Sequence, residues 1–456
     1  MKYSWLQTVF PIAAIFSFRM LGLFMLIPVF TVLAKQLEDA TPALTGLALG
    51  SYGLTQGLLQ MPLGMLSDRF GRKPILTLGL LLFALGSLLG AFSHSIYSMI
   101  IARTLQGTGA IGSVLIALIA DLTPDEQRTK AMAVIGMTIG LSFSLAMIIS
   151  PALTHHFGLA GIFYLTAGLA LLGLLLLHLI IPTPAKERFH GDSEANPTYF
   201  KTVISNRHLQ RLNLGIFFQH FILTSTFYAI PLLLQQQIRL GHLHQQWHFY
   251  LPIMFISFML MVPFIILAEK KRQMKVVFCS AVLLTAATQF LLVFYNLSWF
   301  ILCALMLIYF IAFNVLEATL PSLISKQANP GMKGTAMGIY SSSQFLGIFL
   351  GGTFAGLLYQ LTGSAGIFMI NGLLGGLWLI VALFMKPNIY LSNLTLPYSA
   401  KANDIELIVS RLKTLKGVID FSVAESEQVI YLRVDKTQYV DGSAGQLLAE
   451  YSNSTS

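Results

Sequence analysis

Charged residues are scarce in this chain of 456 residues. Asp, Glu, Lys and Arg together make up 10% of it, whereas soluble domains carry about 25%. Hydrophobic residues make up 55%, and the mean hydropathy is +0.72. Such a composition excludes an ordinary soluble globular protein and indicates an integral membrane protein.

Cysteine is also rare, since Cys279 and Cys303 are the only two and both lie in apolar runs. This excludes a disulfide framework and a Cys-rich metal centre. The sequence has no phosphate-binding loop, no G-x-S-x-G, no H-E-x-x-H and no dinucleotide fingerprint. We therefore expect no enzymatic activity and no cofactor. We also expect no metal site, because the adjacent His155 and His156 point in different directions on a helix.

The formal net charge of +9 raises the question of a nucleic-acid partner. The basic residues are spread over loops and form no patch with base-stacking aromatics, so no nucleic acid is expected. Attraction to the anionic headgroups of a lipid bilayer explains the charge more simply.

Twelve apolar stretches have about the 20 residues needed to cross a membrane. They cover roughly residues 8–34, 43–66, 74–93, 96–120, 129–154, 159–182, 210–236, 247–269, 275–294, 297–323, 332–359 and 364–386. The loops on one side hold 16 Lys and Arg residues, and those on the other hold only Lys35 and Arg239. Because positive residues favour the cytosol, both termini are predicted to be cytosolic.

The stretch from Gly64 to Leu76, G-M-L-S-D-R-F-G-R-K-P-I-L, joins the second and third spans, and we call it the signature loop. It resembles the loop motif of the major facilitator superfamily, G-x-L-x-D-R-x-G-R-(K/R)-x-x-x-(L/I). The matched positions are Gly64, Leu66, Asp68, Arg69, Gly71, Arg72 and Lys73. The simpler alternative is an ordinary cytosolic turn rich in positive charge.

The two halves of the chain repeat each other. Pro62-x5-Asp68-Arg69 recurs as Pro263-x5-Glu269-Lys270 at an offset of 201 residues, and Arg128-x-x-Ala131-Met132 recurs as Lys333-x-x-Ala336-Met337 at an offset of 205. The resemblance implies two parallel six-helix halves in an all-α membrane fold. We assign residues 1–182 and 209–387 to the halves and residues 183–208 to a cytosolic linker.

Residues 388–456 carry charge like a soluble domain. Strands are expected at 389–396, 418–423 and 429–434, and helices at 403–416 and from about Ser443. This order predicts a small α+β ferredoxin-like domain that lacks its last strand. Twelve spans with such a domain resemble the YajR group of bacterial transporters, as do Phe313–Lys326 and Lys333–Gly347 in the tenth and eleventh spans. The domain is expected to bind a regulator or to self-associate, or else to serve trafficking or assembly.

The signature loop contributes the first set of candidate residues. Asp121 ends the fourth span on the same side as Asp68 and Arg72, so two carboxylates and one guanidinium can form charge-assisted hydrogen bonds. The resemblance implies that this loop latches one state of an alternating-access cycle. Arg128 is a further latch candidate or simply a basic residue at a helix start.

Polar residues within the spans form the second set, because polar groups in the membrane are costly and mark substrate or ion paths. These are Arg19, Arg103, Gln106, His220, Asn314, Glu317 and Gln344. The offset of 201 maps Arg19 onto His220, so we expect the two to face each other, with His220 as a proton-linked switch. No carboxylate is expected at that depth, since Glu317 is placed closer to the cytosol. The alternative is that these groups are structural hydrogen-bonding residues.

The resemblance implies a secondary transporter of the bacterial inner membrane that works by alternating access. Its partners would be protons and a small molecule that it exports, with an amphipathic molecule as one option. The antiporter motif G-x-x-x-G-P is only partly met, because the fifth span reads A-M-I-I-S-P at residues 146–151. Two alternatives stay open: a passive uniporter, and a membrane receptor that signals through its C-terminal domain.

Overall fold

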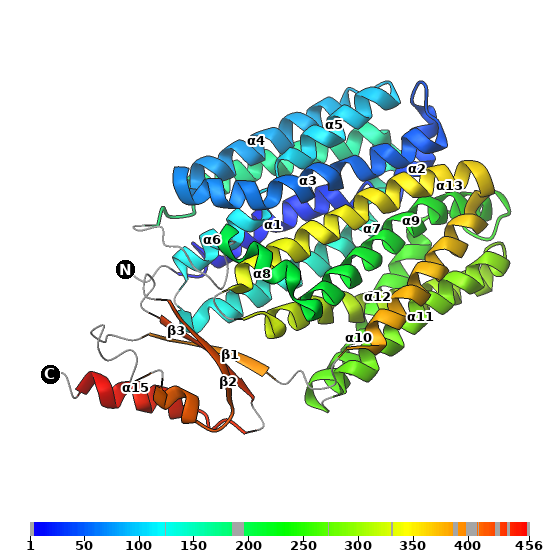
Figure 1. Cartoon of the computed structure of the whole chain (residues 1–456). Coiled ribbons are helices and arrows are strands. Elements are labelled where there is room, and N and C mark those ends of the chain that lie inside the picture. The colour runs from blue at the N-terminus through cyan, green and yellow to red at the C-terminus, as the bar shows by residue number, and fades with distance from the viewer. Residues whose placement is uncertain are drawn as a thin grey trace.

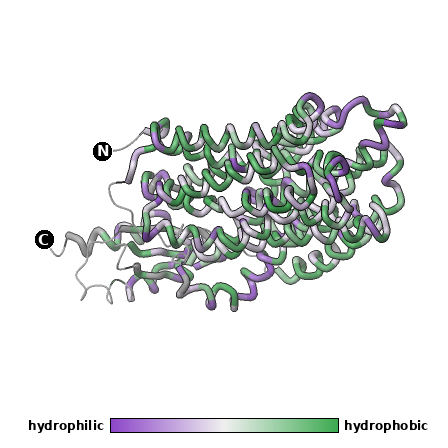
Figure 2. Tube along the Cα trace, turned by 90° about the horizontal axis from the view of Figure 1, so that it is seen from above, coloured by the Kyte–Doolittle hydropathy of each residue, from purple (hydrophilic) through white to green (hydrophobic). Residues whose placement is uncertain are grey.

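A computed structural model describes residues 4–123, 125–184, 196–271, 273–329, 332–385, 391–397, 408, 410–424, 429–435 and 438–453. Long helices run alongside one another in a bundle, and a small sheet lies beside one end of it (Figure 1). Hydrophobic residues predominate along the helices, and hydrophilic segments are more frequent at the ends of the bundle (Figure 2). This distribution suits a bundle embedded in a bilayer.

The helices of the first half are α1 (Val9–Phe24), α2 (Phe30–Leu33), α3 (Pro42–Phe70), α4 (Arg72–Ala91), α5 (Ile96–Thr108), α6 (Gly112–Leu122) and α7 (Asp125–Leu179). Those of the second half are α8 (Phe200–Ser205), α9 (Arg207–Arg239), α10 (Trp247–Lys270), α11 (Met274–Tyr295), α12 (Trp299–Gln327) and α13 (Lys333–Leu383). Both α7 and α13 are broken by a glycine with left-handed backbone, Gly158 (φ 63°) and Gly363 (φ 68°), so each supplies two spans. With α5 and α6 counted as one span, the predicted twelve-span fold is confirmed.

Local signals at the helix starts agree with this arrangement. Pro42 occupies the first turn of α3, and the Thr41 side chain accepts a hydrogen bond from the backbone N–H of Leu44. Ser95 and Ser98 form a capping box at the start of α5. Asn206 accepts from two backbone N–H groups at the start of α9. These caps fix where each chain segment enters the bundle.

The fourth span, predicted at residues 96–120, is present, but it is not one continuous helix. The backbone departs from helix between Thr108, the last residue of α5, and Gly112, the first of α6. Gly109 lies against α4 so closely that an added Cβ would sit 2.4 Å from the carbonyl oxygen of Gly79. The local glycines allow both the break and this close approach.

The two halves meet along α3 and α13 through small residues. A Cβ on Gly46 would lie 2.4 Å from the Gly352 carbonyl oxygen, and one on Gly50 would lie 2.4 Å from that of Phe349. At the end of the bundle opposite the signature loop, Tyr228 donates a hydrogen bond of 2.9 Å to the Pro42 carbonyl. Glycines permit this backbone contact, which is how helices associate in lipid.

The C-terminal sheet consists of β1 (Leu391–Pro397), β2 (Val418–Ala424) and β3 (Val429–Asp435) in the antiparallel order β1-β3-β2. β3 therefore lies between β1 and β2, as expected of a ferredoxin-like β-α-β-β order. Residues 410–414 of the predicted first helix are helical, and residues 401–407 lie outside the described part. The predicted second helix is α15 (Ser443–Asn453), so the small α+β domain is confirmed.

This packing predicts the effect of a single methyl group. Gly50→Ala should lower the unfolding temperature of the detergent-solubilised protein, because the new Cβ would collide with the Phe349 backbone. Gly376→Ala is the matched control, since no atom lies within 4 Å of its Cβ position. Equal unfolding temperatures for the two variants would show that the α3–α13 contact does not depend on its glycines.

Candidate functional site

The predicted cluster of charges at the signature loop forms. The Arg72 side chain is 1% exposed, and its Nε donates to Asp121 Oδ2 at 3.0 Å. Its Nη1 donates to Ser67 Oγ at 2.7 Å and to the Asp68 carboxylate. One guanidinium thus joins the end of α3, the start of α4 and the end of α6.

The other residues of the signature loop have distinct places. Gly71 has a φ of 95° and so connects α3 to α4 without strain. A Cβ on Gly64 would lie 3.0 Å from Ser113 Oγ, which brings α3 close to α6. Lys73 Nζ donates to the Ile181 carbonyl at 2.7 Å, whereas Arg69 lies over the ring of Phe70. The side chain of Arg128, the remaining latch candidate, lies outside the described part.

A second cluster lies inside the second half, where three helices meet at His220 of α9. The His220 Nδ1 lies 3.3 Å from the Ile216 carbonyl and its Nε2 lies 2.8 Å from Gln344 Nε2. Because an amide nitrogen can only donate, His220 Nε2 accepts this bond and Nδ1 carries the proton. His220 Nε2 also lies 3.8 Å from Glu317 Oε2 of α12.

The expectation that no carboxylate lies near the depth of His220 is wrong, although Glu317 does lie closer to the signature-loop end of the bundle, as predicted. Glu317 is ten residues from the end of α12, and His220 is thirteen residues from the start of α9. These two helix ends lie on the same side of the bundle, so at 1.5 Å per residue the depths differ by only about 4.5 Å. The Glu317 side chain is 26% exposed, yet its Oε2 is buried without a hydrogen-bond partner.

Arg19 lies in a different network from His220. Its Nη2 donates to Tyr52 Oη at 3.2 Å and to Gln56 Oε1, both on α3. Among the described contacts, no hydrogen bond or ion pair joins Arg19 to His220, so the predicted facing pair is not what the structure contains. Tyr52 and Gln56 were not singled out from the sequence, although Gln56 and Gln60 are four residues apart and share one helix face.

Arg103 and Gln106 form a compact unit within the first half. Arg103 Nη1 donates to Gln106 Oε1 at 2.6 Å, and Gln106 Nε2 donates to Ser87 Oγ at 2.9 Å. The Arg103 guanidinium lies 4.8 Å from the centre of the Tyr52 ring. This unit ties α5 to α3 and α4.

Asn314 is placed away from both networks. Its Nδ2 donates to Ser257 Oγ at 3.1 Å and thereby links α12 to α10.

A further buried network, which sequence reasoning missed, joins α9, α11 and the second half of α13 through Ser225, Thr226, Gln289 and Asn371. The network was missed because its hydroxyl and amide residues lie in three separate apolar stretches that share no sequence motif.

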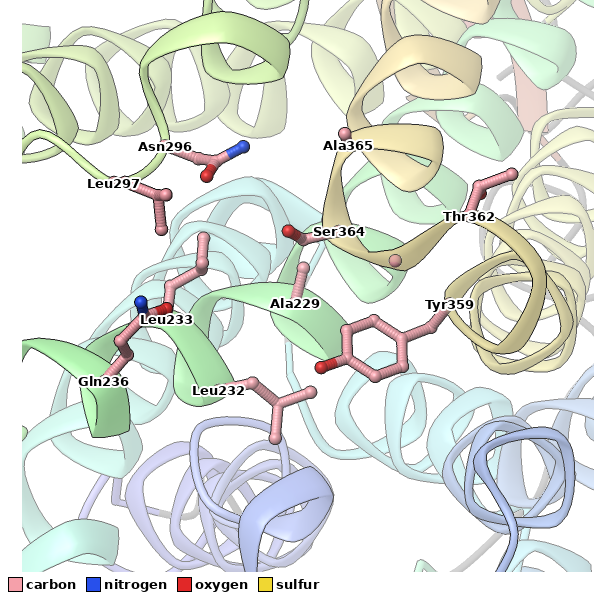
Figure 3. Close-up of a pocket in the computed structure, with 11 residues that line it drawn as sticks. Ala229, Leu232, Leu233, Gln236, Asn296, Leu297, Tyr359, Thr362, Ser364 and Ala365 are labelled. Carbon is pink, nitrogen blue, oxygen red and sulfur yellow. The ribbon is translucent and has the colours of Figure 1, made fainter.

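One described cavity, of about 300 Å³, lies where α9, the end of α11 and the break in α13 meet (Figure 3). Ala229, Leu232 and Leu233 line it with Tyr359 and Ser364. None of the candidate residues lines this cavity, so it is separate from the His220 and Arg19 networks.

The Arg72 contacts predict a large cost for neutralising Asp121. Asp121→Asn should destabilise the folded protein by about 1–3 kcal/mol, because the Asp121 side chain is 0% exposed and faces a buried guanidinium. Glu269→Gln is the control, since its ion pair with Lys326 is partly exposed and should contribute below about 1 kcal/mol. Unfolding titrations in mixed detergent micelles measure both. A smaller loss for Asp121→Asn than for the control would contradict the assignment.

Comparison with known proteins agrees with these features. The chain matches the Major Facilitator Superfamily over residues 12–352 and 212–403. It is 41% identical to the inner membrane transport protein YajR of Escherichia coli K12, with 93% of each chain covered, and 37% identical over 29% of its length to a class B tetracycline resistance protein of Escherichia coli. The crystal structure of a D-xylose-proton symporter covers 83% of this chain with a TM-score of 0.65 at 18% identity. The chain is therefore a membrane transport protein that belongs to the Major Facilitator Superfamily.

Proposed function

We propose that this transporter couples the export of a small molecule to the entry of protons. The observation that carries the proposal is the cluster of His220, Glu317 and Gln344, which places two titratable groups 3.8 Å apart inside the membrane. Each belongs to a different helix of the second half. Such intramembrane ionisable groups are the usual elements of proton relays.

Protonation of the cluster changes its hydrogen bonds in a defined way. In the neutral form, His220 Nε2 accepts from the Gln344 amide N–H. When His220 gains a proton at Nε2, that nitrogen becomes a donor and the Gln344 N–H can no longer bond to it. Gln344 must then turn its oxygen toward His220, or His220 must bond to Glu317 instead. Either change alters how α13 and α12 are held against α9.

An apolar contact between the halves lies next to this cluster. The ring of Phe143, on α7, lies 5.5 Å from that of Phe313 and 6.4 Å from those of Phe227 and Phe310. Phe313 in turn lies 6.2 Å from the His220 ring. A change at His220 can therefore affect the contact between halves, which is what alternating access requires. The aromatic surroundings also suit an amphipathic substrate.

The proposed orientation in the membrane rests on the charges of the loops, and the proposed direction of transport rests on similar proteins. The excess of Lys and Arg at the signature-loop end supports a cytosolic location for that end and for both termini. The resemblance to an inner membrane transport protein supports the bacterial inner membrane. The similarity to a tetracycline resistance protein is consistent with export.

The test is proton movement in sealed liposomes that contain a pH dye. Compounds are screened for those that drive proton flux through the wild-type protein. Glu317→Gln should abolish this flux, because the amide cannot carry a proton across the cycle, and His220→Gln should reduce it and change its pH profile. Glu38→Gln, at an exposed carboxylate outside the repeated motifs, is the control and should keep the flux. Wild-type flux in Glu317→Gln would contradict the proposal.

We further propose that the C-terminal domain regulates transport. Arg433 of β3 lies against the end of α12, and its Nη1 donates to Asn329 Oδ1 at 3.4 Å. Burial lowers the pKa of the Arg433 guanidinium, and the nearby Asp420 opposes this shift. The domain thus touches the connection between the tenth and eleventh spans, whose helices carry Glu317 and Gln344.

A chain that ends at Met385 should still transport, at a changed rate, because no candidate residue lies beyond this point. Arg433→Ala should change the rate in the same direction by releasing the contact with Asn329. Arg411→Ala, an exposed change in the same domain, is the control. Loss of all transport in a folded, inserted truncation would overturn the regulatory role.

A further inference from the structure

The break in the fourth span leaves a helix N-terminus inside the bundle. α6 begins at Gly112 and runs for eleven residues. The described hydrogen bonds provide no acceptor for the backbone N–H groups of Gly112, Ser113 and Val114. These groups carry the positive end of the helix dipole, which attracts anions.

The side chain of Arg19 points at this helix N-terminus. Arg19 Nη1 lies 3.2 Å from the place that a Cβ on Gly112 would take, and both side-chain amide atoms of Gln60 lie 3.7 Å from the same place. Arg19 is 2% exposed, and its buried Nε has no hydrogen-bond partner. The Arg19 guanidinium therefore lies beside the backbone donors at the start of α6.

The charges around this position are unbalanced. In the described part of the chain, the hydrogen-bond partners of Arg19 are the neutral Tyr52 and Gln56, and that of Arg103 is the neutral Gln106. Both guanidinium groups contact Tyr52, Arg19 at its hydroxyl and Arg103 at its ring. Two buried cations without a carboxylate partner are costly in a membrane, and a bound anion would lower that cost.

The internal repeat indicates what this position accepts. The offset of 205 residues that relates Gly158 to Gly363 also relates Gly112 to Glu317. Arg19 is likewise related to His220 by the offset of 201. In the second half the Glu317 carboxylate lies 3.8 Å from the His220 ring, whereas in the first half the equivalent position beside Arg19 is a glycine without a side chain.

We propose that Arg19 and the N-terminus of α6 form a subsite for the carboxylate group of a small organic anion, which is the substrate. The subsite names the substrate class of the proposed transport. It rests on the proposed function only in treating the bound anion as the transported molecule. The Arg19 guanidinium suits bidentate bonding to the carboxylate of the substrate. The backbone N–H groups at the start of α6 are further donors to the same carboxylate. The proton cluster and the subsite belong to opposite halves, so rocking of the halves changes the relation between them.

Binding to the full-length protein in neutral detergent tests the subsite without any proton gradient. The probes are acetate, benzoate and octanoate, each paired with its neutral amide, and the readout is the unfolding temperature as a function of probe concentration. At least one carboxylate should stabilise the wild type saturably and more than its amide does. Arg19→Gln should weaken its apparent affinity about tenfold to a hundredfold, as loss of a charged hydrogen bond does.

Two further variants separate the subsite from general effects. Gly112→Ala keeps Arg19 but adds a methyl group 3.2 Å from its Nη1, so it should hinder a carboxylate at this guanidinium and weaken binding to a similar extent. Arg239→Gln removes an exposed cation and should leave binding unchanged. The proposal is overturned if no carboxylate stabilises the wild type more than its amide, or if Arg19→Gln and Gly112→Ala both bind as the wild type does. Neither result would affect the proton fluxes measured for Glu317→Gln, so the two proposals fail independently.

Discussion

The cost of placing charge in hydrocarbon is the constraint on which this structure depends. A bilayer offers a buried ionisable group no water, so each group must find a partner or carry out a function. The described spans resolve this in three ways. Arg72 is surrounded by acceptors at the signature loop, Arg19 and Arg103 share Tyr52, and His220 is held by Gln344 beside Glu317. Only in the first arrangement does a buried guanidinium face carboxylates, so the other two are the candidates for moving ions and substrate.

The two halves share a backbone plan but carry different charges on it. Gly158 and Gly363 break equivalent helices with nearly the same backbone angles. Glu269, the counterpart of Asp68, pairs with Lys326 at 2.7 Å, so each half has an ion pair at the same end. Inside the bundle the halves diverge, because one holds arginine and the other holds histidine and glutamate. In the proposed mechanism the two interiors have different roles: one half binds substrate and the other handles protons.

Much of this fold could be predicted from sequence, because long apolar stretches and loop charges follow directly from the physics of the bilayer. The contacts of Asp68, Arg72 and Asp121 were predictable for the same reason, since all three had to lie at one end of adjacent spans. The break at residues 109–111 was missed because glycines are common in membrane helices and do not by themselves end one. The pairing of His220 with Glu317 was missed because it depends on which faces of α9 and α12 meet, and the uniformly apolar stretches give no periodicity from which to read a face.

The central claim is that protonation of the Glu317–His220 cluster decides which end of the bundle is open. Distances between paired spin labels across each end, measured as a function of pH in lipid nanodiscs, test it most directly. The account predicts that acidification shifts the distance distributions of the wild-type protein at both ends in opposite senses, and that Glu317→Gln holds one distribution at every pH. Distributions that do not respond to pH in the wild type, or that respond equally in Glu317→Gln, would contradict it.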